Sequence, residues 1–282
     1  QTPFIAMRLV AGEPLAALLA EARPGDALCL EEGIHPGPAT LGEGVTLWGP
    51  RSAVIHSAGS GDTVRLAGAG ARLAGMTIDG SGGRFDLQEA AVQVHGDRAV
   101  VDGTRIVNAL FGIIVAQSRG VVSRGNEIVG SGAPQIGLRG DAVRLWETRD
   151  SRIEANRIVG SRDMVVWYSG GNTITGNEVA GGRYGTHFMY SHDNLVTGNR
   201  YVGNVVGIFA MYSRGLTLER NLLAASTGAA GMGLGLKESS AVTVRDNHIH
   251  HNRHYDGFGY GVTVGNGAYA LVQANVFEQN RH

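Results

Sequence analysis

Histidine and methionine side chains that could bind a metal ion lie close together in the stretch RYGTHFMYSHDN, residues 183–194. His187 and Met189 are two residues apart, so in a β-strand both side chains point from the same face. Met211 lies in the similar phrase IFAMYS, 22 residues after Met189. An imidazole with two thioethers is a soft ligand set typical of copper(I), whereas zinc favours more nitrogen or thiolate ligands. The sequence therefore predicts a copper(I) site at His187, Met189 and Met211, with His192 nearby.

Aromatic residues accompany these ligands. Trp146 and Trp167 occupy the equivalent position in the two preceding repeats, and Phe209 is equivalent to His187. Strand alternation places all three on the outer face, because the intervening positions are almost wholly apolar and face inward. We predict an aromatic surface patch here. An alternative interpretation is that the methionines and tryptophans only pack against a loop or a partner, since such residues outside a core usually mark contact surfaces.

A second group of histidines lies in DNHIHHNRHYDG, where His248 and His250 flank Ile249 and share one strand face. Such a pair can bind a transition metal, so the two residues form a possible second metal site, although surface histidines in a polar corner are commoner.

Carboxylates are missing from the outward positions of the repeat. Asp141, Asp163 and Asp193 fall at strand edges or bends, where aspartate is ordinary turn chemistry. The sequence therefore lacks the acid pair expected of a polysaccharide-cleaving enzyme.

A repeating asparagine shows how these residues are positioned. It opens similar phrases such as GNEIVG, ANRIVG and GNEVAG, at spacings of 30, 21, 22, 22, 26 and 28 residues. A period in the low twenties is typical of a solenoid with one coil per repeat. Asparagine tolerates the left-handed backbone of a sharp bend, and stacked amides can hydrogen-bond between coils. The predicted ladder consists of Asn126, Asn156, Asn177, Asn199, Asn221, Asn247 and Asn275.

The fold predicted from this repeat is all-β: a right-handed parallel β-helix of roughly ten coils, with insertions as loops on one or two edges. We expect one domain over residues 1–282, with regular coils from about residue 90 onward. The segment EPLAALLAEARPGD predicts a short helix at about 13–22 that caps the first coil. Cys29 alternates with its neighbours in a way that predicts a buried core position. The last strands should present unpaired backbone groups that a partner or a continuation of the chain covers.

Composition excludes several classes of protein. The chain has 44 glycines but only 7 prolines in 282 residues, which excludes collagen and favours a fold with many tight corners. Basic and acidic residues number 24 and 25, so there is no basic footprint for nucleic acid. No apolar run reaches the length of a transmembrane helix.

Several phrases resemble the NosD family. They are RGDAVRLW, SRDMVVWYS, RYGTHFMYSHDN, VGIFAMYSRGLTLERN and GMGLGLKESS, within about residues 90 to 252. The resemblance implies a periplasmic, non-enzymatic β-helix protein that helps deliver copper for assembly of the nitrous oxide reductase copper site. It further implies an ABC-type permease and its ATPase, a copper-donating lipoprotein chaperone and the reductase itself as partners. The alternative is a carbohydrate-binding or polysaccharide-cleaving β-helix protein.

Overall fold

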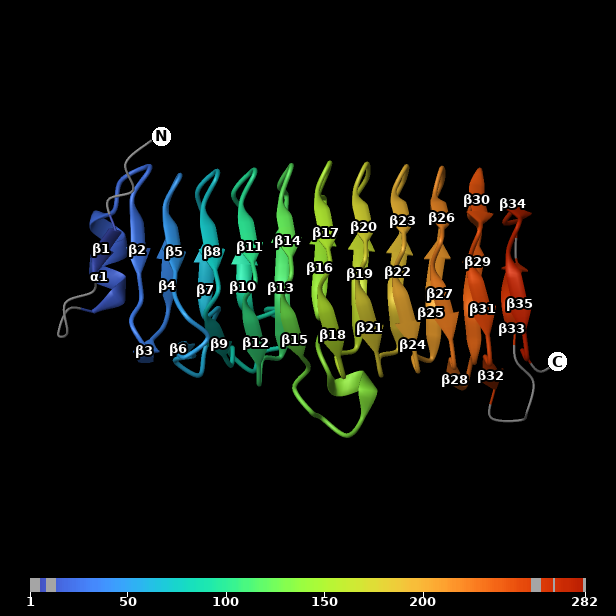
Figure 1. The fold of residues 1–282 in the computed structure, drawn as a ribbon, viewed down its shortest axis with the longest axis horizontal. Coiled ribbons are helices and arrows are strands. Elements are labelled where there is room, and N and C mark those ends of the chain that lie inside the picture. Colours follow the sequence, from blue (N-terminus) through green and yellow to red (C-terminus); the bar gives the residue numbers. More distant parts are fainter. Residues whose placement is uncertain (1–5, 9–13, 255–259, 266, 281–282) are drawn as a thin grey trace.

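The chain winds into a coil whose walls are three parallel β-sheets, as the computed structural model in Figure 1 shows. The structure describes residues 6–8, 14–254, 260–265 and 267–280. We call the 12-stranded sheet A, the 11-stranded sheet B and the 10-stranded sheet C. Each turn visits A, then B, then C, and every strand pairs with its counterpart one turn away, so the described chain makes about ten turns. The predicted fold class, a right-handed parallel β-helix, is confirmed.

The strands are short, as the frequent corners require. Sheet A contains β1 (Ala6–Arg8), β2 (Ala27–Cys29), β5 (Thr46–Trp48), β8 (Arg72–Ala74), β11 (Val100–Asp102), β14 (Val122–Arg124), β17 (Arg152–Glu154), β20 (Thr173–Thr175), β23 (Leu195–Thr197), β26 (Thr217–Glu219), β30 (Val242–Arg245) and β34 (Ala270–Gln273). Sheet B contains β3 (Gly33–Pro36), β6 (Ala53–His56), β9 (Thr77–Asp79), β12 (Arg105–Val107), β15 (Glu127–Val129), β18 (Arg157–Val159), β21 (Glu178–Ala180), β24 (Arg200–Val202), β27 (Leu222–Ala224), β31 (His248–His250) and β35 (Val276–Glu278). Sheet C contains β4 (Ala39–Leu41), β7 (Val64–Leu66), β10 (Ala90–Val94), β13 (Phe111–Ala116), β16 (Val143–Trp146), β19 (Asp163–Trp167), β22 (Tyr184–Met189), β25 (Val206–Met211), β29 (Met232–Lys237) and β33 (Tyr260–Gly265).

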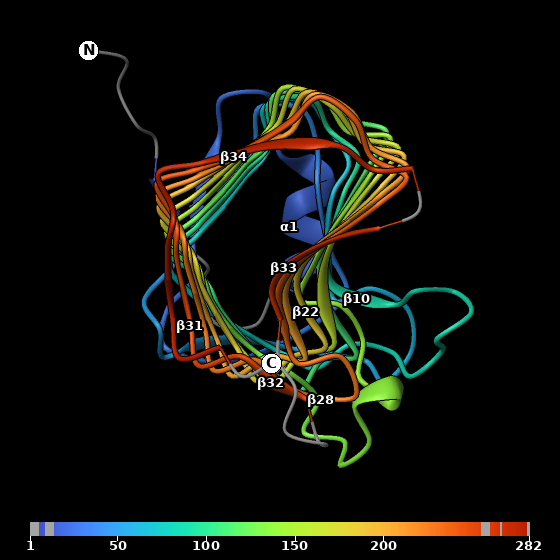
Figure 2. The same cartoon turned by 90° about the vertical axis from the view of Figure 1, so that its right-hand side faces the viewer.

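Helix α1 (Leu15–Glu21) lies across the N-terminal end of the coil, as the end-on view in Figure 2 shows. Leu15 and Leu19 are buried against the interior, so the helix covers the first turn as the apolar spacing predicts. The predicted start at residue 13 lies outside the described residues.

The prediction for Cys29 was wrong. Its neighbours on both sides, Leu28 and Leu30, point inward, and Cys29 is therefore only half-buried.

The interior is filled by the two apolar columns expected from strand alternation. In sheet C the first column includes Ile113, Met164 and Ile208 and the second includes Phe188, all of them buried. In β33 the columns are less covered, because no further described strand of sheet C follows it: Val262 is half-buried and Val264 is 44% exposed. Stacking of equivalent apolar residues from turn to turn is the main stabilising feature of such a coil.

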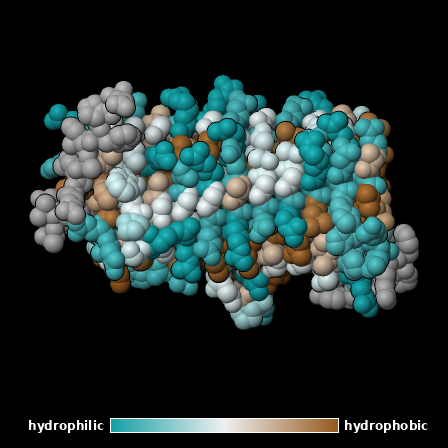
Figure 3. All heavy atoms as spheres, viewed as in Figure 1, coloured by the Kyte–Doolittle hydropathy of each residue, from teal (hydrophilic) through white to brown (hydrophobic). Residues whose placement is uncertain are grey.

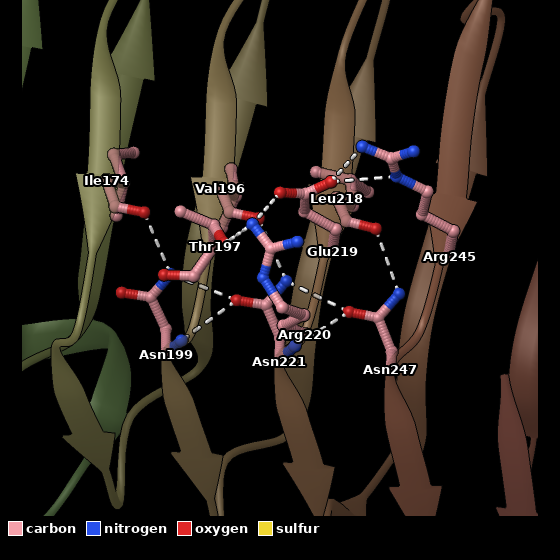
Figure 4. Close-up of polar contacts among 10 residues, drawn as sticks. All are labelled: Ile174, Val196, Thr197, Asn199, Leu218, Glu219, Arg220, Asn221, Arg245 and Asn247. Carbon is pink, nitrogen blue, oxygen red and sulfur yellow. Dashed lines mark hydrogen bonds and ion pairs between the residues drawn. The ribbon is translucent and has the colours of Figure 1, made fainter.

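The asparagine ladder runs along the corner between sheets A and B, as predicted (Figure 4). The Oδ1 atom of Asn199 accepts hydrogen bonds from the backbone N–H and from the Nδ2 atom of Asn177, both at 2.9 Å. Asn221 and Asn247 repeat the arrangement one and two turns later. Because these amides are buried and satisfy one another, the sharp corner leaves no backbone donor without a partner at these positions.

Two further polar ladders were not predicted. At the corner between sheets C and A, the amides of Asn172 and Asn194 are hydrogen-bonded at 3.0 Å. Beside them, the hydroxyl of Ser191 accepts from the Ser169 N–H at 3.1 Å, as expected of serines that serve a corner. At the corner between sheets B and C, Asn204 accepts from the Gly182 N–H at 2.9 Å. Each of the three corners is therefore stabilised by stacked polar side chains.

The insertions in the repeat all lie at one corner, between sheets B and C. Residues 80–89 and 130–142 form two longer connections there, and the second carries a 3-10 helix, η1 (Ile136–Leu138). They project beside sheet C in the end-on view (cyan and green in Figure 2). A two-stranded sheet of β28 (Thr227–Gly228) and β32 (Arg253–His254) lies at the same corner. The prediction of loops on one or two edges is confirmed.

The surface in the orientation of Figure 1 is mainly hydrophilic, with hydrophobic residues gathered in the lower half of the view (Figure 3).

Strands β33, β34 and β35 come last in their sheets among the described residues, and Phe277 of β35 is 48% exposed. That a partner or further chain covers these strands stays a prediction. In the described part of the chain, no helix is long and apolar enough to cross a membrane.

Candidate metal-binding face

The outer face of sheet C carries the predicted ligands, and a local irregularity shapes it. Strand β22 contains one more residue than β19 between paired positions: Asp163 pairs with Tyr184, but Val165 pairs with His187. Such a bulge turns one residue outward that simple alternation would place inward. Tyr184 therefore lies on the same face as His187, which strict alternation from the sequence did not predict.

His187 faces outward but is only 8% exposed. Its ring lies 4.6 Å from the ring of Tyr184 and 5.9 Å from that of Phe209, measured between centroids. Burial lowers the pKa of His187 from 6.5 to about 4, although the negative charge of Asp163 opposes this effect. The imidazole is therefore neutral at physiological pH, and its buried Nε2 atom has no hydrogen-bond partner among the described residues. A neutral imidazole with a free nitrogen is the form that binds metals.

Met189 and Met211 are aligned on adjacent strands, β22 and β25, and both are half-buried. Their backbones are therefore one strand spacing apart, about 4.8 Å. Met232, in β29, was not predicted as part of this face. The space beside Gly235, which has no side chain, is bordered by the sulfur atom of Met232 and by the ring of Phe209. Sheet C therefore carries a third methionine, whose thioether lies close to the aromatic ring that contacts His187.

The aromatic residues form two groups rather than one patch. Phe209 packs with Tyr184 and His187. Trp146 and Trp167 contact each other edge to face at 4.8 Å and both contact Tyr168 at the next corner. The guanidinium of Arg144 lies 5.3 Å from the Trp167 ring centroid.

His192 lies away from the strand face, in the corner between sheets C and A. Its Nδ1 atom accepts a hydrogen bond from the Arg214 N–H at 3.1 Å, and it lines a groove with Tyr190. The structure brings His187, Met189 and Met211 onto one face and places His192 at the neighbouring corner.

The interpretation of Asp141 and Asp163 as turn residues was wrong. Their side chains are 0% and 1% exposed, and both are ion-paired with arginines. Arg162 donates to Asp141 at 2.8 Å, and Arg183 pairs with Asp163. Burial raises the pKa of the Asp141 carboxyl despite these cations. Asp163, the first residue of β19, pairs with Tyr184 and accepts a hydrogen bond from the Tyr184 backbone N–H at 3.1 Å.

The possible second metal site lies on the outer face of sheet B. The rings of His248 and His250 are 4.5 Å apart, as expected for residues on one strand face. Each histidine, however, has another partner: His248 lies 3.1 Å from Glu278, and Nδ1 of His250 lies 2.6 Å from Nδ1 of His251. Partial burial, followed by the neighbouring imidazoles, lowers the pKa of His250.

No group of three or more His, Cys, Asp and Glu side chains in the described ranges is arranged to hold a metal ion. On sheet C the soft ligands that share a face with His187 are the thioethers of Met189 and Met211. The residues on sheet C fit copper(I) by this criterion, because a neutral imidazole with an unpaired nitrogen lies on the same face as aligned methionines.

Solved structures place the chain among parallel β-helix proteins. The mannuronan C-5 epimerase AlgE6 A-module of Azotobacter vinelandii superimposes with a TM-score of 0.69 and 12% identity, covering 94% of this chain and 88% of that one. A polygalacturonase from Erwinia carotovora has a TM-score of 0.67 at 13% identity, covering 98% and 97%. PfbA, a surface adhesin of Streptococcus pneumoniae, has a TM-score of 0.69 at 11% identity, covering 94% and 86%. At these identities the similarity shows the fold alone.

The sequence defines the family within that class. Residues 120–282 match the family described as "Periplasmic copper-binding protein (NosD)", and the chain belongs to the NosD family. A similar curated protein is the "Probable ABC transporter binding protein NosD" of Stutzerimonas stutzeri, 26% identical over 136 residues. That alignment covers 48% of this chain and 31% of the relative, so the chain spans about a third of the relative's length. The suggested membership from the sequence phrases is confirmed.

Proposed function

We propose that this protein is a periplasmic, non-enzymatic copper carrier that binds copper(I) transiently at His187, Met189 and Met211. The observation that carries the proposal is the buried, neutral imidazole of His187, whose Nε2 atom has no partner on a face that also bears aligned thioethers. An unpaired buried nitrogen costs free energy, and a bound metal ion would recover it. The description of the family as periplasmic and copper-binding supports the same conclusion.

A carrier must also release its cargo. Thioether and imidazole ligands bind copper(I) without the strength of a thiolate cluster, and Met189 and Met211 are half-buried rather than enclosed. We propose that copper passes from a lipoprotein chaperone through this site to nitrous oxide reductase, alongside an ABC-type permease and its ATPase. Support for the transporter comes from the name of the Stutzerimonas stutzeri relative.

A polysaccharide-cleaving function is the alternative from a different class. It would need carboxylates that reach a substrate. Those nearest the outer face of sheet C, Asp141 and Asp163, are enclosed and ion-paired. This arrangement supports the carrier function over the enzyme.

The test is a competition titration with a copper(I) chelator under anaerobic, reducing conditions. The double variant Met189→Leu/Met211→Leu keeps side-chain volume and removes sulfur. We expect it to bind copper(I) at least about tenfold more weakly than the parent, which corresponds to about 1.4 kcal/mol. The matched control is Met76→Leu/Met164→Leu, which removes two sulfurs from buried interior positions and should leave the affinity unchanged. Equal affinity in the parent and the Met189→Leu/Met211→Leu variant would show that the methionines only pack.

A further inference from the structure

A groove of about 450 Å³ lies at the corner between sheets C and A. Equivalent residues of successive turns follow one another along this corner, and backbone bridges connect Arg119 to Arg149, Arg149 to Gly170, and His192 to Arg214. Gly170 interrupts this row of long side chains. Because glycine has no side chain, Gly170 leaves a groove with Arg149 on one side and His192 and Arg214 on the other.

Tyr168 and Tyr190 form one wall of the groove, and they belong to a row of three stacked tyrosines. Tyr168, Tyr190 and Tyr212 come from three successive turns, with ring centroids 5.2 and 4.8 Å apart and planes within 11° of parallel. All three have positive φ angles, of 49°, 49° and 52°. Gln117, Glu147 and Glu238 have the same left-handed backbone at this corner in other turns, so the conformation belongs to the corner and fixes the direction of the three tyrosines.

The stacking determines what the tyrosines can bind. Within the row, each tyrosine ring is stacked on the ring of the next turn. At one end of the row Tyr168 stacks on Trp167, and at the other end the Lys237 ammonium lies over the Tyr212 ring. What remains open is the ring edges and hydroxyls: Tyr168 and Tyr190 are 46% and 40% exposed. Ring edges carry partial positive charge, and phenol hydroxyls donate hydrogen bonds. The wall therefore favours an anionic group over the flat face of a sugar.

Two arginines of the groove are available to a ligand. Arg119 is ion-paired with Asp150 at 2.7 Å. The side chains of Arg149 and Arg214 are exposed and have no hydrogen bond or ion pair to any other described residue. Asp193 also lines the groove. The three arginines and two aspartates of the groove give it one net positive charge, not counting His192.

The spacing of the two available arginines identifies the occupant. Arg149 and Arg214 are three turns apart, which places their backbones about 14 Å from each other. At this separation the two guanidinium groups can each pair with a separate carboxylate of one extended ligand. An extended polypeptide covers about 13 Å in four residues, and residues four apart project from the same face of the strand.

We propose that this groove docks an acidic, extended segment of a partner protein, with two carboxylates four residues apart that pair with Arg149 and Arg214. The tyrosine hydroxyls bind the intervening backbone or carboxylate oxygens. Arginine and tyrosine are the residue types most often found at the energetic centre of protein interfaces. The docking requires no metal, so it stands independently of the copper site.

The test measures fluorescence anisotropy of a labelled peptide that carries two glutamates four residues apart in a serine- and threonine-rich background. The protein is kept metal-free with a chelator, so the result does not depend on copper binding. We expect the double variant Arg149→Ser/Arg214→Ser to bind the peptide about tenfold more weakly and to lose most of the salt dependence of binding. A peptide of equal composition with the two glutamates adjacent should also bind more weakly.

The control variant is Arg157→Ser/Arg200→Ser, which removes two exposed arginines of sheet B whose nearest carboxylates are 3.8 and 3.6 Å away. It should bind like the parent. Undetectable binding of the peptide to the parent, or equal loss in both double variants, would overturn the proposal. So would competition by tetragalacturonate at lower concentration than the unlabelled peptide, which would assign the groove to an acidic polysaccharide.

Discussion

Replacing Asn199 by leucine probes the ladder that sets the sharp corner between sheets A and B. The Oδ1 atom of Asn199 accepts the backbone N–H of Asn177 at 2.9 Å, and its Nδ2 atom donates to the Ile174 carbonyl at 2.9 Å. Leucine removes both contacts. The neighbouring side chains keep other partners, since Asn177 Nδ2 still donates to the Ile153 carbonyl at 2.8 Å.

One buried donor is left without a partner: the backbone N–H of Asn177. An unsatisfied buried amide costs about 1 to 3 kcal/mol, and this is the expected loss in the free energy of unfolding. For a chain of this size the midpoint of thermal unfolding should fall by several degrees.

Thermal and urea unfolding, followed by circular dichroism, measure the loss. Asn275→Leu is the matched control, because Asn275 holds the same position at the half-exposed last step of the described ladder. The hydrogen bond from the Asn247 N–H that this variant removes is only partly buried, so the loss of stability should be less than half as large. An unchanged melting temperature for Asn199→Leu, or equal losses in both variants, would refute the stabilising role of the ladder.

Other predictions concern the interior and the pH dependence of stability. Because the pKa of His187 is lowered to about 4, the folded state resists protonation, so stability falls as the pH drops below about 6.5. Urea unfolding should show about 2 kcal/mol lost between pH 7 and 5, and a His187→Phe variant should lack this component. Gly185→Ala places a Cβ atom 2.4 Å from the Gly207 carbonyl oxygen and from a Tyr201 ring carbon, so we expect a loss of about 1 to 3 kcal/mol in thermal unfolding. Tyr201→Phe removes the 2.8 Å hydrogen bond to the Thr186 hydroxyl and should cost about 1 kcal/mol in the same assay; an unchanged midpoint would contradict it.

The repeat made the fold predictable from the sequence. One asparagine per turn fixed both the period and the corner, and alternation within strands then assigned inward residues such as Phe188 and outward residues such as His187. Alignment of Met189 with Met211 followed from the same period. These features depend on local sequence and on contacts between adjacent turns, which repeat sequences specify strongly.

The bulge in β22 was not predictable in this way. Gly185 lies within the bulge and packs closely between the Gly207 carbonyl and the Tyr201 ring. Strict alternation therefore misplaced Tyr184, and it could not show that arginines enclose Asp141 and Asp163. The tyrosine row had a visible signal, since Tyr168 and Tyr190 each precede a corner serine, but its left-handed backbone and stacked rings emerge only when the turns are assembled.

X-ray absorption at the copper K-edge, on the protein loaded with one equivalent of copper(I), tests the copper site most directly. The proposed site predicts sulfur scatterers together with one imidazole in the parent. In Met189→Leu/Met211→Leu the sulfur contribution should disappear, whereas Met76→Leu/Met164→Leu should keep the parent spectrum. A nitrogen- and oxygen-only environment in the parent, unchanged in the Met189→Leu/Met211→Leu variant, would contradict a copper site on the outer face of sheet C.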